Sequence, residues 1–270
     1  MIRDLLIRGM IAGLVAGLLA FGVAKVFGEP QVDRAIAFEE QQAVPSAHQH
    51  QHAGVDEQQP AGAQVHEQVH EHGDEDLVSR KVQSTLGLLT AVVVYGAAMG
   101  GLFALAFAFL YGRVGDVGPR MLALLLAAAA FAAIYYVPNL KYPASPPAVG
   151  DGATIGYRTG LYFLMMLISL GGLVLAVAAG RRLAERYGGL NGTLSGAALF
   201  VAIIIVAQLV LPDINEVPAD FPAAVLWEFR TASLGLQALM WGTLGLLFGL
   251  LAERRLKGSR GQPAKALRPA

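Results

Sequence analysis

Long apolar runs alternate with short polar segments along the whole chain, and this pattern predicts membrane-spanning helices. At a rise of about 1.5 Å per residue, roughly 20 apolar residues cross a hydrocarbon core of about 30 Å. The pattern therefore predicts an all-α protein, a polytopic membrane helix bundle with six transmembrane helices. The six runs are residues 5–27, 85–111, 120–137, 159–180, 193–211 and 231–251.

Glycine and proline mark the predicted ends of these helices. Gly28-Glu29-Pro30 is expected to end the first helix, with a short amphipathic helix after it. Pro138 is expected to end the third, and the proline-rich loop 138–158 is predicted to be extended. The loop before the sixth helix is predicted to run from Pro212 through Arg230.

The first apolar run has a second interpretation, a cleaved signal peptide. Its apolar part, from Leu5 to Ala24, exceeds the usual signal-peptide core of about 7–15 residues, so we expect a retained helix. Gly9, Gly13 and Gly17 recur at GxxxG spacing, which lets another helix approach closely. This face predicts close helix packing and offers a contact for a homo-oligomer.

Composition restricts the class of protein further. Charged residues make up 15% of the chain, against about 25% in soluble domains, which agrees with a lipid-bilayer environment. The absence of cysteine excludes disulfides, thiolate metal sites and cysteine nucleophiles. No Walker A motif and no nucleophile–base–acid constellation is present, so neither an ATPase nor another enzyme is expected, and no nucleic-acid partner.

Charge predicts the orientation. When the loops are taken alternately from the N-terminus, 13 of the 20 Lys and Arg residues fall on one side. By the positive-inside rule that side is cytoplasmic, so both termini are cytoplasmic and the localisation is a bacterial inner membrane. Sixteen of the 20 acids lie on the outer side, which makes that face attractive to cations. The predicted organisation is a first transmembrane helix (1–27), an external loop with a His-rich metal-binding segment (28–84), a five-helix bundle (85–251) and a basic cytoplasmic tail (252–270).

All six histidines fall within 25 positions of the predicted external loop: His48, His50, His52, His66, His70 and His72. Neutral imidazole is a good ligand for Co²⁺, Ni²⁺, Cu²⁺ and Zn²⁺. The segment therefore predicts a site that gathers divalent transition metals, with Co²⁺, or Ni²⁺ or Zn²⁺, as the bound or transported ion and no tightly bound cofactor. The alternative is a solvated low-complexity linker without a metal.

A route through the bilayer is not evident, because no span contains a central ionisable residue. Gln208 and Gln237 are expected to form interhelical hydrogen bonds. Carboxylates gather instead at the outer helix ends, where Glu29, Asp33 and Glu216 are candidate metal ligands of an acidic vestibule. Arg158 and Arg230 are expected to neutralise nearby acids there. Other polar residues of the spans are Tyr95, Ser169 and Thr243.

Several short motifs follow one another in a fixed order along nearly the whole chain. They are Gly28-Glu29-Pro30 with Asp33 and Glu39-Glu40, the histidine segment, Val78-Ser79-Arg80 with Gln83, Lys141-Tyr142-Pro143 with Pro146-Pro147, Leu211-Pro212 with Asn215-Glu216, and Trp227-x-Phe229-Arg230. Together they resemble the predicted cobalt transporter subunit family of the CbtA type. The resemblance implies cobalt uptake linked to cobalamin synthesis, and a small companion subunit with a single span and its own histidine cluster. The family is often described with five spans, whereas six are predicted here.

Two functions remain open from the sequence. The first is a membrane subunit for uptake of cobalt or a related divalent metal, which the resemblance favours. The second is a metal-binding receptor or scaffold that serves a separate permease, which the scarcity of polar residues in the spans favours.

Overall fold

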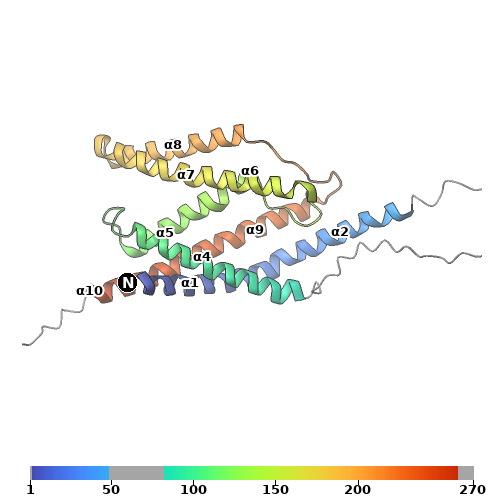
Figure 1. Ribbon diagram of the computed structural model, residues 1–270, viewed down its shortest axis with the longest axis horizontal. Coiled ribbons are helices and arrows are strands. Elements are labelled where there is room, and N and C mark those ends of the chain that lie inside the picture. Colours follow the sequence, from blue (N-terminus) through green and yellow to red (C-terminus); the bar gives the residue numbers. More distant parts are fainter. Residues whose placement is uncertain (1, 49–81, 261–270) are drawn as a thin grey trace, which may run out of the picture.

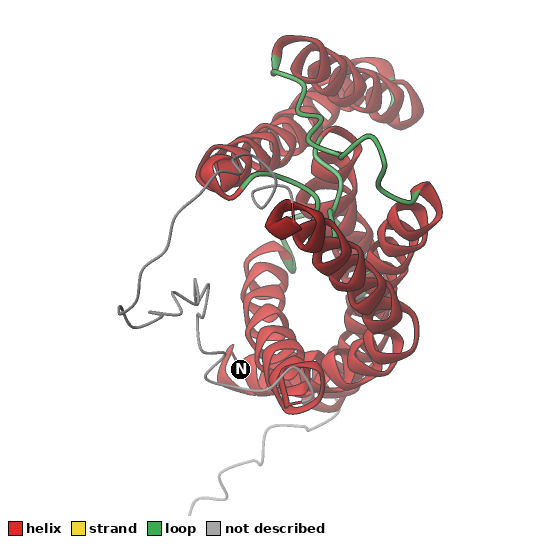
Figure 2. Ribbon diagram, turned by 90° about the vertical axis from the view of Figure 1, so that its right-hand side faces the viewer, coloured by secondary structure: helices red, strands yellow, loops and turns green. Residues whose placement is uncertain are grey.

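The computed structural model describes residues 2–48 and 82–260 of the chain (Figure 1). Every regular element in these two ranges is a helix, and Figure 2 shows helices and loops without a strand. The predicted all-α class and the six spans are confirmed. The helices long and apolar enough to cross a membrane are Ile2–Gln42, Gln83–Leu110, Pro119–Lys141, Gly152–Tyr187, Gly189–Val210 and Ala223–Lys257.

Most of these long helices contain a short π-helical or 3₁₀ turn. The first consists of α1 (Ile2–Val23), a π turn (Ala24–Gly28) and α2 (Glu29–His48). The second joins a π turn (Gln83–Gly87) to α4 (Leu88–Leu110). The third consists of α5 (Pro119–Ala130), a π turn (Phe131–Tyr136) and α6 (Val137–Lys141). The fourth joins a 3₁₀ turn (Gly152–Thr154) to α7 (Ile155–Tyr187), and the fifth is α8 (Gly189–Val210). The sixth consists of α9 (Ala223–Thr243), a π turn (Leu244–Phe248) and α10 (Gly249–Arg260).

The predictions that Pro30 and Pro138 end their helices are wrong. Each proline is the second residue after a π turn, where the hydrogen-bond register has just changed: Glu29 N–H donates to Ala24, and Val137 N–H donates to Ala132. A proline is tolerated in the first turn of a helix because its missing N–H is not needed there. The predicted external loop 28–84 therefore begins as a helix that runs to His48.

The fourth and sixth helices begin well before their predicted starts at residues 159 and 231. The fourth begins at Gly152 because Asp151 accepts a hydrogen bond from the Ala153 N–H, which caps its first turn. The sixth begins at Ala223, directly after Pro222, so Arg230 lies on α9 and not in a loop. Apolar runs mark the part of a helix that crosses lipid, whereas the polar turns beyond the lipid carry no such signal.

The glycine face of α1 packs against α4 of the same chain. A Cβ added at Gly13 would collide with the Gly96 carbonyl oxygen, and one at Gly9 would collide with that of Gly100. The two backbones are therefore in direct contact, as GxxxG spacing predicts. The expected homo-oligomer contact through Gly9, Gly13 and Gly17 meets a face that α4 already covers.

The described helices form two groups. In the first, α1, α4, α5, α9 and α10 enclose an apolar core in which the Phe248 ring packs edge-on against Phe103 and Phe107, with centroids 5.4 and 5.0 Å apart. In the second, α7 and α8 form a hairpin, the upper layer of Figure 1. The hairpin joins the rest at a smaller cluster that contains Val137, Met165 and Ala207.

The bundle has two distinct ends (Figure 1). The N-terminus of α1, the end of α10 and the α7–α8 turn lie at one, which we name the terminal end. Asp4 and Arg255 form an ion pair there, at 2.9 Å. The segments 142–151 and 211–222 and the start of α9 lie at the other, which we name the loop end, and α2 extends from the bundle on this side.

Candidate functional site

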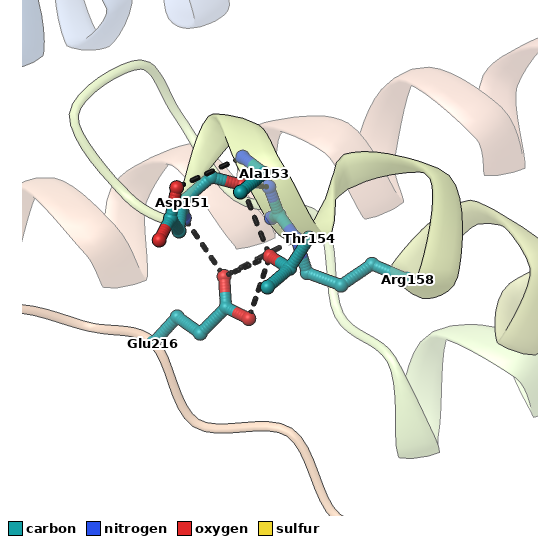
Figure 3. A network of polar contacts seen from close by, with 5 residues as sticks. All are labelled: Asp151, Ala153, Thr154, Arg158 and Glu216. Atoms are coloured by element: carbon teal, nitrogen blue, oxygen red, sulfur yellow. Dashed lines mark hydrogen bonds and ion pairs between the residues drawn. The ribbon is translucent and has the colours of Figure 1, made fainter.

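Glu216 joins the two long loops at the loop end (Figure 3). Its carboxylate accepts hydrogen bonds from the Asp151 backbone N–H at 2.8 Å and from the Thr154 hydroxyl, which lies 2.8 and 2.9 Å from the two oxygens. The Arg158 Nε lies 3.2 Å from the same carboxylate. The arrangement connects the loop before α9 to the first turns of the fourth long helix.

These donors stabilise the ionised form of Glu216. The Asp151 N–H contributes most, followed by the Thr154 hydroxyl, and the Arg158 guanidinium adds a favourable charge, so the pKa of Glu216 is held below its usual range. The carboxylate is therefore ionised at neutral pH and its charge is matched by Arg158. The expectation that Arg158 neutralises a nearby acid is confirmed.

Lys141 forms a second connection between the same loops. Its side chain is 7% exposed, donates to the Gln208 carbonyl at 2.8 Å and pairs with Asp213. The neighbouring Tyr142 hydroxyl donates to the Pro212 carbonyl at 2.9 Å. Lys141 thereby supplies a donor to the last turn of α8, where carbonyl groups have no partner in the helix.

The third connection runs from α2 to the loop end. Arg34 pairs with Glu228 of α9 at 3.0 Å, and Gln42 donates to Asp220. The Phe38 ring packs edge-on against Phe221 with centroids 5.1 Å apart. All three outer segments predicted from the sequence to meet do meet. Asp213, Glu216 and Glu228 are each paired with a cation, and the acidic vestibule stays a prediction.

The predicted metal ligands are placed as follows. Glu29 and Asp33 lie one turn apart at the start of α2, and Glu216 lies in the loop before α9. Among the side chains that the structure describes, in 2–42 and 82–257, no group of three His, Asp or Glu is arranged to hold a metal ion. His48 is the last residue of α2, and the remaining predicted ligands lie outside the described residues: His50, His52, His66, His70 and His72.

The polar residues within the spans make few contacts. In the described part of the chain, the side chains of Gln208 and Gln237 form no hydrogen bond, so the expected interhelical bonds are absent. The Ser169 side chain is fully buried, and its hydroxyl has no partner there. Lys25 donates to the hydroxyl and carbonyl of Ser84, at 3.2 and 3.1 Å, across the start of the second long helix.

A cavity of about 460 Å³ opens beside the Glu216 connection, and the sequence did not predict it. Arg230 lines it from α9, and the Arg230 Nε donates to the Ala144 carbonyl at 3.3 Å. Arg230 forms no ion pair with any described residue, so the expectation that it neutralises an acid is wrong. The sequence feature that came nearest to predicting this cavity was the group of polar residues that flank the predicted loops.

Comparison with known proteins identifies the family. A family model described as probable cobalt transporter subunit (CbtA) matches residues 2–253, nearly the whole chain. No curated protein and no solved structure matches it. The match includes the first five long helices, most of the sixth, and both loops of the loop end. The chain is therefore a multi-pass membrane protein that belongs to the CbtA family of probable cobalt transporter subunits.

Proposed function

We propose that this chain is a membrane subunit for the uptake of cobalt, or of a related divalent metal such as Ni²⁺ or Zn²⁺. The observation that carries the proposal is the family match over residues 2–253. The six helices long and apolar enough to cross a membrane agree with a subunit that works within the bilayer. The family is one of transporter subunits, which favours transport over catalysis.

The histidine segment acts as a collector of ions outside the cell. Imidazole and carboxylate groups bind divalent transition metals at neutral pH, and protonation of the imidazoles releases them below about pH 6. The first histidine, His48, ends the helix α2, which extends from the bundle (Figure 1). The segment therefore begins at a point that would extend into solution if the loop end faces outward.

The orientation follows from charge. Lys and Arg residues concentrate in the tail and in the loops of the terminal end, so that end faces the cytoplasm of a bacterium and both termini lie inside. The loop end then faces outward. Glu29 and Asp33, at the outer end of the first span, are the proposed carboxylates that receive the ion, whereas Glu216 holds two loops together.

A metal receptor or scaffold that serves a separate permease is the second candidate. It is favoured by the scarcity of polar residues in the predicted spans, which contain no central ionisable residue to mark an ion route. The family resemblance also implies a small single-span companion with its own histidines. In either case any ATP hydrolysis that drives uptake must take place on another chain, because this sequence has no Walker A motif.

Reconstitution separates the two candidates. The purified chain is inserted into liposomes that contain a metal-sensitive fluorophore, with and without the companion subunit, and Co²⁺ is added outside. A transport subunit gives a signal that rises faster than in empty liposomes and slows when Glu29 or Asp33 is replaced by its amide. Binding of Co²⁺ without entry under both conditions would contradict transport and support the scaffold.

A further inference from the structure

The cavity beside Glu216 is enclosed by four segments from distant parts of the sequence. They are the loop after α6, the first turns of α7, the loop before α9 and the second turn of α9. Its volume, about 460 Å³, lies in the range of small-molecule sites, roughly 300–1,000 Å³. The lining residues used below are Ser145, Gly150, Arg158, Asn215, Glu216 and Arg230.

The charges on the cavity wall do not cancel. Arg158 and Glu216 form an ion pair, and Arg158 is further fixed because its NH2 group donates to the Asp151 carbonyl at 3.0 Å. The Gly150 backbone lies directly against this guanidinium, so that a Cβ there would collide with it. Two guanidinium groups and one carboxylate therefore line the cavity, and the excess charge is the cation of Arg230.

Arg230 keeps most of its donors uncommitted. A guanidinium has five N–H groups, and in the described part of the chain Arg230 uses only its Nε–H, toward Ala144. The side chains of Ser145 and Asn215 likewise form no hydrogen bond with any described residue. The remaining guanidinium donors of Arg230 and the polar side chains of Ser145 and Asn215 thus line the same cavity without a described protein partner.

We infer that this cavity binds a small oxyanion, with Arg230 as the group that recognises its charge. A half-buried charge is costly to leave without a partner, and the planar guanidinium fork fits a carboxylate or phosphate with two parallel hydrogen bonds. A free divalent cation would meet a wall with excess positive charge. The site is independent of the proposed metal function, because no step in the inference uses a metal.

Direct binding to the purified full-length chain tests the inference. Citrate is titrated by calorimetry into protein from which lipid has been removed, and the wild type is compared with Arg230→Gln. The wild type is expected to bind citrate saturably, and Arg230→Gln is expected to bind at least tenfold more weakly. Arg34→Gln is the matched control, because Arg34 lies on α2, pairs with Glu228 and does not line the cavity.

A second source of the oxyanion is the headgroup of a lipid with net negative charge, and a second arm of the experiment distinguishes this source. The titration is repeated in nanodiscs of phosphatidylcholine with and without phosphatidylglycerol. A dissolved ligand predicts equal citrate binding in both, whereas a lipid source predicts that phosphatidylglycerol suppresses citrate binding in the wild type.

The inference is overturned if the wild type binds citrate in none of these preparations, or if Arg230→Gln binds it as tightly as the wild type. If Arg230→Gln does not give folded protein, Asn215→Ala replaces it in the comparison. That variant is expected to bind several-fold more weakly, and unchanged binding would count equally against the site.

Discussion

At the scale of single residues, Glu216 shows how a polar side chain outside the lipid can organise a membrane protein. Its carboxylate accepts from one backbone N–H and one hydroxyl and pairs with one guanidinium. The donors come from positions more than 60 residues away in the sequence, and they connect the loop before α9 to the fourth long helix.

Replacement of Glu216 by Gln is expected to destabilise the loop end. The folded-state pKa of Glu216 is lowered, so the ionised carboxylate contributes stability above the ordinary carboxyl pKa of about 4.3, and this contribution is lost as the pH falls through the folded-state pKa. Thermal unfolding in detergent, followed by tryptophan fluorescence, should give a lower apparent Tm for Glu216→Gln at pH 7 and a smaller difference from wild type below about pH 4.

Glu185→Gln is the control for the loss of one negative charge. Glu185 is exposed near the end of α7 and has no hydrogen bond or ion pair with a described residue. The Glu185→Gln variant should have the same apparent Tm as the wild type at every pH in the series. Equal Tm values for Glu216→Gln and the wild type at pH 7 would show that the Glu216 connection does not stabilise the fold.

Lys141 gives a second prediction at this scale. Lys141→Met keeps the length of the side chain but leaves the Gln208 carbonyl and Asp213 without their cation. A hydrogen bond to a charged group contributes about 1.5–3 kcal/mol, and we expect a loss of this size in the free energy of unfolding.

The matched control is Lys257→Met. It removes the i,i+4 pair that the exposed Lys257 side chain forms with Glu253, and it should cost only about 0.3–0.5 kcal/mol. Similar losses in the two variants would contradict the role of Lys141.

The chemical role of a residue type was easier to predict from the sequence than the residue with which it would pair. The pairing of Arg158 with Glu216 was expected in kind, because acids and bases were both present near the loop end. That Arg230 would remain without an acid could not be predicted, because its position relative to Glu216 depends on how α7 and α9 pack. The six clustered histidines predict metal binding. This stays a prediction, because all of them but His48 lie outside the described residues.

At the scale of elements, the α1–α4 pair depends on glycine at specific positions. Gly13→Ala should destabilise the protein by about 1–3 kcal/mol, because the new methyl group meets the Gly96 carbonyl and the helices must separate. Gly22→Ala is the matched control on the same helix: nothing lies within 4 Å of its added methyl group. Helix propensity alone predicts a gain of up to about 1 kcal/mol for that control. Unfolding midpoints of the two variants in detergent check the prediction, and a Gly13→Ala protein as stable as Gly22→Ala would contradict the packing.

The elements were predicted well where they cross lipid and less well beyond it. Apolar runs of about 20 residues identified all six long helices, because lipid requires a continuous apolar surface. The ends were wrong at Pro30 and Pro138, where the rule that proline stops a helix was overcome by a π turn directly before it. The GxxxG face was identified correctly as a packing surface, whereas the identity of its partner, α4, required the structure.

At the scale of the whole molecule, the two ends of the bundle predict a topology. The chain has no native cysteine, so a single introduced cysteine reports its own location. In intact cells a membrane-impermeant maleimide should label Ala219→Cys at the loop end and should not label Asp116→Cys in the α4–α5 turn. Both should react after permeabilisation. The opposite pattern would place the loop end and the proposed collector in the cytoplasm.

The central claim is that the chain serves cobalt uptake, with the histidine segment as a collector and not as the essential site. The most direct measurement is the initial rate of radioactive cobalt uptake in host cells that lack the chain and are supplied with the wild type or with a variant lacking residues 46–76. The account predicts that the wild type restores uptake, and that the variant is slow at low cobalt but approaches the wild type at high cobalt. Uptake that is the same with and without the wild-type chain would contradict the transport function, and complete loss in the variant at every concentration would contradict the collector.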